Sequence, residues 1–197
     1  EKAVVFIEYA PLETAWVPIL GDNYLYLYCL WVSGSYKGKG YGKELLQSCI
    51  DDAKAQGKSG ICLLSSKKKK PFLSEKKFML KYGFKVVDTI NDEYELLALS
   101  FDATQPQFTS NVRKQSIEGK ELTIYYGVQC PYIPNCIEQI YNYCENNQIP
   151  LRLVEIDTLE KAKQLPCIFN NWAVFYNGKF ETVHLLNEGL LKKLLLR

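Results

Sequence analysis

The residues that point most directly to chemistry are three glycines at alternate positions, Gly38, Gly40 and Gly42, between an apolar stretch and a helix pattern. Glycine adopts a positive φ readily and carries no side chain, so an anion can approach the main chain closely. The first N–H groups of a helix have no intrahelical partner and lie at the positive end of the helix dipole. We therefore predict a binding site for a phosphate or a pyrophosphate at this loop.

The residues around the glycines support an anion site but do not match the two best-known phosphate loops. Lys37, Lys39 and Lys43 add positive charge, and Tyr41 offers a flat face. The dinucleotide pattern G-x-G-x-x-G fails because the third glycine comes one position early, and no Gly-Lys-Ser/Thr closes the run as in a Walker loop. A glycine-rich turn that binds nothing stays open as the alternative.

The elements that position this loop follow from the hydrophobic pattern. We expect a strand over 3–9 and a central strand over 24–32, which alternates regularly and is apolar on both faces. In that strand Tyr24, Tyr26, Tyr28 and Leu30 are predicted to face one way, and Leu25, Leu27, Cys29 and Trp31 the other. After the loop we expect a helix that stops at Gly57, a strand over 60–64, a helix over about 74–82, and a hairpin formed by 85–90 and 94–101.

The segment from Lys37 to Gly42 resembles motif A of the GCN5-related N-acetyltransferase (GNAT) superfamily, written Arg/Gln-x-x-Gly-x-Gly/Ala. The order strand, glycine loop, helix, strand, helix, Gly-Phe and two strands is similar to the later part of that fold. The resemblance implies an α/β (α+β) class with a mixed sheet and helices on both faces. Members begin with a strand, two helices and another strand, which this chain lacks, so we expect a fragment or a fold completed in another way.

The resemblance implies an acetyl-CoA-dependent N-acetyltransferase that moves an acyl group from coenzyme A to an amine of a small molecule or a protein. The pyrophosphate would bind the loop, and the pantetheine arm would lie beside the preceding strand like an added strand. The implied cofactor-binding residues are Leu30, Trp31, Val32, Lys37, Gly38, Lys39, Gly40, Tyr41, Gly42 and Lys43.

The catalytic residues match the family pattern less closely. Members often carry a tyrosine as general acid four residues before the Gly-Phe pair, and Met79 occupies that position here. Tyr82 is the candidate replacement, with core packing as its alternative role. Glu8 and Glu13, on and after the first strand, are the candidate general bases.

The rest of the chain predicts a second domain. Residues 102–120 are polar and are predicted to form a linker, so we expect domains over 1–101 and 121–197. The order β-α-β-α-β-β-α in 121–197 is similar to a thioredoxin-like domain. A GNAT module followed by a Cys130 to Cys136 segment, Cys-Pro-Tyr-Ile-Pro-Asn-Cys, and by Asn-Asn-Trp-Ala-Val-Phe-Tyr-Asn-Gly-Lys-Phe resembles the YoaP-type acetyltransferases of bacteria.

Two alternative functions stay open. Cys130 precedes a predicted helix, where a thiol has a lowered pKa, so thiol–disulfide exchange by the second domain is one hypothesis. The second redox cysteine would normally stand at Ile133, and Cys136 lies one helical turn beyond that position. The other is a binding module that holds acyl-CoA but catalyses weakly.

Composition excludes several other classes. The net charge of +2 gives no electrostatic case for nucleic-acid binding, and no apolar run approaches the roughly 20 residues of a membrane span. Seven cysteines, an odd number, without a signal-peptide layout favour a reducing cytoplasm. No metal site is expected, because His184 is the one histidine and we expect it half-buried in a strand. The run Lys67 to Lys70 predicts a solvated loop or, alternatively, a lysine that reaches a cofactor phosphate.

Overall fold

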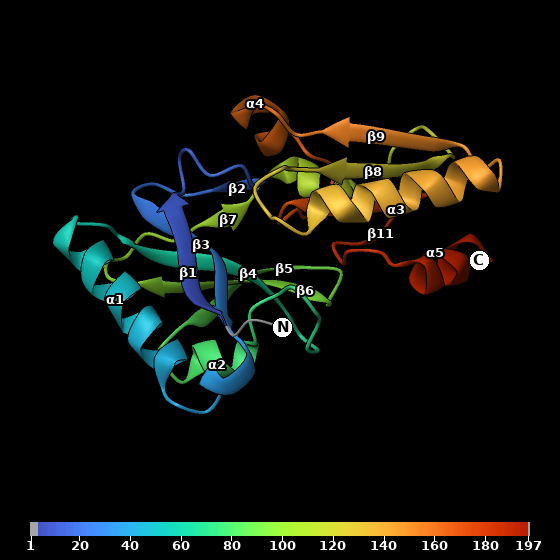
Figure 1. Ribbon diagram of the computed structural model, residues 1–197. Helices are drawn as coiled ribbons and strands as arrows, with labels where there is room; N and C mark the ends of the chain where they lie inside the picture. The colour runs from blue at the N-terminus through green and yellow to red at the C-terminus, as the bar shows by residue number, and fades with distance from the viewer. Residues whose placement is uncertain (1–3, 197) are drawn as a thin grey trace. The chain divides into compact units, whose positions relative to one another are not determined.

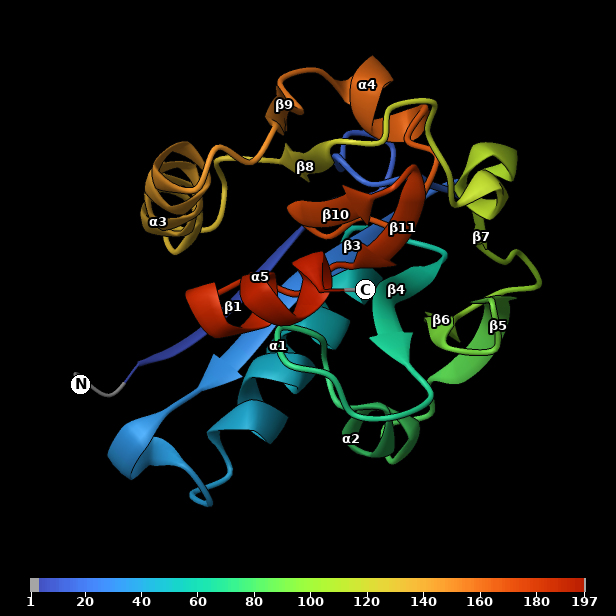
Figure 2. The same cartoon turned by 90° about the vertical axis from the view of Figure 1, so that its right-hand side faces the viewer.

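The computed structural model describes residues 4–196 and divides into two compact units (Figures 1 and 2). The first unit comprises the described residues up to Ala15 and Ile19–Phe108, and the second comprises Trp16–Pro18 and the residues from Thr109 onward. Each unit has its own sheet and its own apolar core.

The first unit is built on a five-stranded sheet in the order β1-β3-β4-β6-β5 (Figure 1). Its strands are β1 (Val5–Pro11), β3 (Tyr24–Val32), β4 (Gly60–Ser66), β5 (Lys85–Ile90) and β6 (Tyr94–Ser100). The β3–β4 pair is parallel and the other pairs are antiparallel, so the sheet is mixed, as expected. Two short strands, β2 (Ile19–Leu20) and β7 (Gln107–Phe108), form a separate ladder.

Both helices of the first unit pack on the same face of this sheet. Helix α1 (Tyr41–Ala55) and helix α2 (Lys76–Leu80) share one core cluster. In that cluster Leu46 of α1 and Met79 of α2 meet Leu25 and Leu27 of β3. The expectation of helices on both faces is therefore wrong for the described part of this unit. Both helices pack their apolar sides against the same strand side chains, on one face of the sheet.

A β-bulge in β3 changes which residues share a face. Cys29 is paired with Glu8 of β1, but Leu27 is paired with the next β1 residue, Tyr9, so Tyr28 is an extra residue in β3. A bulge shifts the alternation of side chains by one position. Leu30 therefore packs into the same cluster as Leu27, and its predicted place on the face of Tyr24 and Tyr26 is wrong.

The parallel strands β3 and β4 separate soon after they begin. Their pairing runs only from Tyr24 opposite Gly60 to Tyr26 opposite Cys62. Both strands continue, β3 to Val32 and β4 to Ser66, so the sheet opens between them toward the end where the glycine loop starts. The apolar pattern predicts a strand that is buried on both faces along its whole length. This holds for Tyr24 to Tyr28, which are buried, but not for Trp31, which is 43% exposed.

The second unit is a four-stranded sheet with helices on both faces. The order is β11-β10-β8-β9, with β8 and β9 parallel and the other pairs antiparallel. Helices α3 and α5 pack on one face, and the segment around α4 packs on the other (Figure 2). The elements are β8 (Leu122–Tyr126), α3 (Ile133–Asn146), β9 (Leu151–Glu155), α4 (Leu159–Lys163), β10 (Trp172–Tyr176), β11 (Lys179–Thr182) and α5 (Glu188–Leu195).

Some boundaries differ from the sequence-based expectations. The segment 102–120 contains β7 and a 3-10 helix over Ser110–Lys114, with Phe108 and Val112 buried, so it is more ordered than a linker. The first strand runs on to Pro11, and Ala3 lies outside the described residues. His184 is half-buried but follows the end of β11.

Within residues 4–196, no helix has the length and apolar composition needed to cross a membrane.

The start of the β3–β4 pairing gives the first testable prediction. A Cβ added at Gly60 would overlap the carbonyl oxygen of Leu99 and lie 2.6 Å from Cε1 of the buried Tyr24. We expect Gly60→Ala to lower the free energy of unfolding by about 2 kcal/mol, because neighbouring backbone cannot yield. Urea unfolding measures this change. Gly42→Ala is the control: its Cβ would meet Phe78 Cζ at an ordinary 3.6 Å, so no loss of stability is expected, and an equal loss in both variants would contradict the account.

Candidate functional site

The glycine loop enters α1 through two residues with positive φ. Gly38 has φ +76° and Gly40, the N-cap of α1, has φ +90°. Nothing lies within 4 Å of the Cβ position of either residue, so the space above them is open. Gly42 differs from the expectation: it lies inside the first turn of α1, and its hydrogen atom makes room for packing.

The N-terminus of α1 presents backbone donors to this open space. Gly40 has no side chain with which to cap the helix, and its carbonyl oxygen accepts hydrogen bonds from the N–H groups of Lys43 and Glu44 at 2.9 and 3.2 Å. Within residues 4–196 the N–H groups of Tyr41 and Gly42 have no hydrogen-bond partner, as the first positions of a helix require. This arrangement suits a phosphate, because N–H donors and the helix dipole coincide.

Three lysines surround the loop, as the sequence indicates. Lys37, Lys39 and Lys43 are exposed, and none forms an ion pair with another residue in the described part of the chain. The ring of Tyr41 stands edge-on to that of Tyr36, with centroids 5.6 Å apart. The loop is thus positively charged and aromatic on its outer side.

An apolar corner connects the loop to the strand opening. A Cβ at Gly42 would lie 3.6 Å from Phe78 of α2, 3.7 Å from Leu30 Cδ2 and 3.8 Å from Val32 Cγ2. The structure therefore brings Leu30 and Val32 together with the loop, whereas Trp31 points to the other face and is half exposed. A chain-like apolar ligand can run from the loop along this edge of β3.

A hydrogen bond fixes α1 against the edge of the sheet. The Tyr9 hydroxyl in β1 donates to Oδ2 of Asp52 in α1 at 3.0 Å. Burial, with this bond to a carboxylate, raises the pKa of Tyr9 to about 12. The hydroxyl therefore keeps its proton throughout the neutral range, and the bond holds the helix whose N-terminus forms the loop.

The two candidate bases lie at different levels along β3. Glu8 is paired with Cys29, next to the bulge at Tyr28. Glu13 instead accepts a 2.6 Å hydrogen bond from the N–H of Asn23, which has a positive φ just before β3 begins. The loop follows the other end of β3, roughly 25 Å away at the usual strand rise. The carboxylate of Glu13 supports the turn at Asn23, and this contact favours a structural role for it.

The candidate general acid is part of the core. Tyr82 packs against the cluster that α1 and α2 share, with its ring centroid 5.0 Å from that of Phe78. Met79, at the family's tyrosine position, is 1% exposed and packs in the same cluster. These contacts favour the packing role for Tyr82.

The lysine run at 67–70 is largely paired with carboxylates. Lys67 contacts Asp92 at 2.7 Å, Lys69 contacts Glu75 at 3.0 Å, and Lys70 contacts Glu93. These pairs favour the interpretation as a surface loop over a contact with a phosphate.

Lys76 and Glu95 form a pair that the sequence analysis does not identify. Lys76 Nζ lies 2.7 Å from Glu95 Oε1, and the Glu95 side chain is only 9% exposed. The signal available was a glutamate inside the apolar run of β6, where a charge is rarely buried unless it is paired. Its partner, 19 residues earlier, could not be found from the spacing.

The two candidate redox cysteines have different environments. Cys136 in α3 is buried, and its Sγ donates to the carbonyl of Leu186 at 3.1 Å. Burial, with the nearby Cys130, raises the pKa of Cys136 to about 11. Cys130 precedes α3 and is half-buried. In the exchange hypothesis Cys130 is the attacking thiol, and the burial and raised pKa of Cys136 slow its reaction as the second cysteine.

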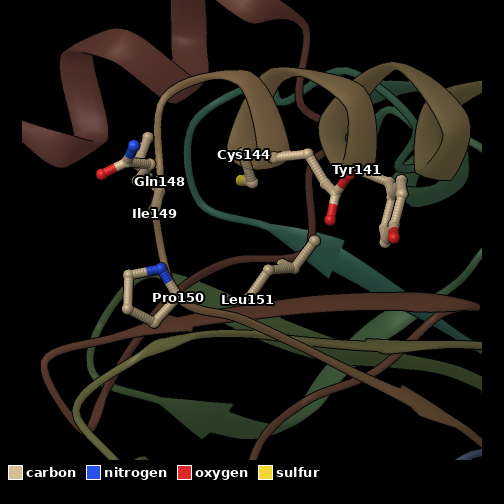
Figure 3. A pocket seen from close by; sticks show the side chains of 7 residues that line it. Tyr141, Cys144, Gln148, Ile149, Pro150 and Leu151 are labelled. Atoms are coloured by element: carbon tan, nitrogen blue, oxygen red, sulfur yellow. The ribbon is translucent and has the colours of Figure 1, made fainter.

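Two surface hollows lie in the second unit. One, of about 320 Å³, is bounded by the end of α3 and the start of β9, with Tyr141, Cys144 and Leu151 in its lining (Figure 3). The other, of about 580 Å³, lies between α3 and α5. Neither contains a residue predicted to bind a cofactor.

Among residues 4–196, no three histidine, cysteine or acidic side chains are close enough to hold a metal ion.

Comparison with known proteins places the chain in a family. Residues 2–84 match the acetyltransferase (GNAT) family, and residues 150–193 match the YoaP-like family. The chain belongs to the GNAT N-acetyltransferase family and carries a YoaP-like C-terminal region. Its relative in Bacillus subtilis strain 168, named "Uncharacterized N-acetyltransferase YoaP", is 40% identical over 99% of this chain and 78% of that protein.

Two solved structures of GNAT-family proteins are similar to about half of the chain. A GNAT-family protein from Desulfovibrio desulfuricans is 17% identical, with a TM-score of 0.40 over 49% of this chain and 60% of that chain. A GNAT family acetyltransferase from Brucella melitensis, solved in complex with acetyl-CoA, is 19% identical, with a TM-score of 0.36 over 52% of this chain and 53% of that one. The chain therefore spans less than two thirds of either protein.

The environment of Cys136 gives the second prediction. A thiol with a pKa of about 11 is ionised to about one part in a thousand at pH 8. We expect iodoacetamide to alkylate Cys136 about 100-fold more slowly in the native chain than in the urea-unfolded chain, because the thiolate reacts and the native thiol is also buried. Peptide mass spectrometry measures both rates. Cys130 is the control and should be slowed much less; equal native and unfolded rates at Cys136 would restore the exchange hypothesis.

Proposed function

We propose that the chain catalyses acetyl-CoA-dependent transfer of an acetyl group to an amine. The observation that carries this function is the position of the α1 N-terminus, with the open N–H groups of Tyr41 and Gly42, beside the opening between the parallel strands β3 and β4. Family membership supports the same reaction class. The acceptor is either a small molecule or a protein.

The residues of the site suit the parts of acetyl-CoA. The N–H groups from Gly38 to Lys43 would hold the pyrophosphate, with Lys37, Lys39 and Lys43 supplying positive charge. Leu30, Val32 and Phe78 would contact the pantetheine arm as it enters the opening like an added strand. Trp31 would flank the arm from the other face. A backbone N–H at this end of β3 would polarise the thioester carbonyl.

Among the acidic residues, we assign the role of general base to Glu8. An acceptor amine must lose a proton as it attacks the thioester. Glu8 is paired with Cys29 beside the bulge, at the level where β3 and β4 have separated. Tyr82 and Glu13 are not assigned a chemical step, because their contacts give each a structural role.

We further infer that the second unit has a thioredoxin-like arrangement. Its strand order, with one parallel pair extended by two antiparallel strands, and its helix order support this inference. It would act as an accessory domain beside the acetyltransferase unit, in line with the buried state of Cys136. The proposed domain boundary lies near Phe108, where the first compact unit ends.

The anion site is tested by a substitution at the N-cap of α1. In Gly40→Asp the new carboxylate would lie in the anion site and repel the phosphate of the ligand. An aspartate would also be strained at the φ of +90° that Gly40 adopts. Calorimetric titration with acetyl-CoA should show binding to the wild type that weakens at least about 100-fold in this variant. Gly57→Asp is the matched control, because Gly57 also has a positive φ and open space but lies beyond the other end of α1. Unchanged binding by Gly40→Asp would remove the loop from the site.

The general base is tested by Glu8→Gln. Loss of the carboxylate should lower kcat about 100-fold while KM for acetyl-CoA changes little. The assay is coenzyme A release with a panel of primary amines. Glu13→Gln serves as the control, because its amide oxygen can still accept the hydrogen bond from Asn23. A Glu8→Gln variant with full kcat would exclude this role.

A further inference from the structure

A partly buried ion pair joins α2 to the sheet beside the strand opening. Lys76 Nζ and Glu95 Oε1 are 2.7 Å apart, and the two side chains are 27% and 9% exposed. Glu95 of β6 is paired with Ser65 of β4. Ser65 lies in the part of β4 that has already separated from β3. The ion pair is therefore one strand away from the opening.

The pair has unused hydrogen-bonding capacity. Glu95 Oε2 is buried and has no hydrogen-bond partner among the residues that the structure describes. An unsatisfied buried carboxylate oxygen costs free energy, so such an atom is usually completed by a ligand or by water. An ammonium group has three donors, and one hydrogen bond of Lys76 goes to Glu95. A ligand at this position can thus find both a donor and an acceptor.

Helix α2, which carries Lys76, also packs on the two strands that border the opening. Met79 packs in the core cluster with Leu27 of β3 and Leu63 of β4, one residue from each of the separating strands. Residues three positions apart share one face of a helix. Lys76 therefore lies on the Met79 face, one turn from the position at which the GNAT pattern has its tyrosine.

We propose that Lys76 is the proton donor to the sulfur of the departing coenzyme A, and that Glu95 is the positioning residue that holds its ammonium group. This assignment rests on the proposed acetyl transfer. When the tetrahedral intermediate collapses, the C–S bond breaks and its electron pair leaves with sulfur. One proton moves from Lys76 Nζ to that sulfur. The neutral amine then regains a proton from water, which reaches the partly exposed lysine.

The direct test compares coenzyme A with desulfo-coenzyme A, which lacks the sulfur atom. Calorimetric titrations of the full chain at pH 8.5 should show that the wild type binds coenzyme A about tenfold more tightly, because a charged donor lies beside the sulfur. Lys76→Met should bind both ligands equally. Lys77→Met is the matched control: it removes an exposed lysine from the same helix and should keep the preference.

Three further variants separate proton donation from structure. Lys76→Arg keeps the charge but does not release a proton near neutral pH, so it should keep the preference for coenzyme A while acetyl transfer falls about 100-fold. Glu95→Gln should reduce the preference, because the ammonium loses its anchor. If Lys76→Met does not fold, since Glu95 would then be a buried uncompensated charge, Lys76→Gln/Glu95→Gln removes both charges and should also abolish the preference.

The possible outcomes distinguish this assignment from the function on which it rests. An equal preference for coenzyme A in the wild type and in the variants without Lys76, or full turnover by Lys76→Arg, would overturn the role of Lys76 alone. Failure of the wild type to bind either ligand would overturn the proposed function and this assignment with it. Loss of the preference in Lys76→Met, together with its retention in Lys77→Met, would support both.

Discussion

The separation of β3 from β4 is the constraint on which the rest of the first unit depends. Parallel strands normally continue their ladder, because each buried backbone group needs a partner. Here the pairing ends at Tyr26 and Cys62 while both strands continue. The bulge at Tyr28 shifts the phase of β3 at the same level, so Leu30 turns to the helix side. The result is an opening bordered by the stretches of β3 and β4 that no longer pair with each other and by apolar side chains such as Leu30.

The helices make this opening a site for an extended, anionic ligand. Helix α1 is held to the sheet by its apolar face and, near its C-terminal end, by the Tyr9–Asp52 bond, while its N-terminus follows the glycine loop after β3. Helix α2 brings Phe78 to the loop side and Met79 onto both separating strands. Charge at the loop and apolar contacts along β3 suit the phosphate and the arm of such a ligand, and the Lys76–Glu95 pair lies beside β4 on the other side of the opening.

Much of this arrangement could be predicted from local sequence. The apolar run Tyr24–Val32, the glycines and the helical spacing of Leu46 and Cys49 correctly predict the strand, the loop and α1. The bulge could not be predicted, because it depends on the register with β1 and leaves no signal in the alternation of β3. The face of the sheet on which both helices pack and the Lys76–Glu95 pair depend on long-range packing in the same way. So does the hydrogen bond from the N–H of Asn23 to Glu13, which a turn brings together.

The most direct test of the central claim is amide hydrogen exchange of the full chain with and without coenzyme A. A ligand that lies in the opening as an added strand must protect backbone amides along its path. The account predicts increased protection in peptides covering Leu27–Val32, Gly38–Lys43 and Leu63–Ser66, with little change in α3 and α5. Protection confined to the second unit, or bound coenzyme A without protection at the loop, would contradict it.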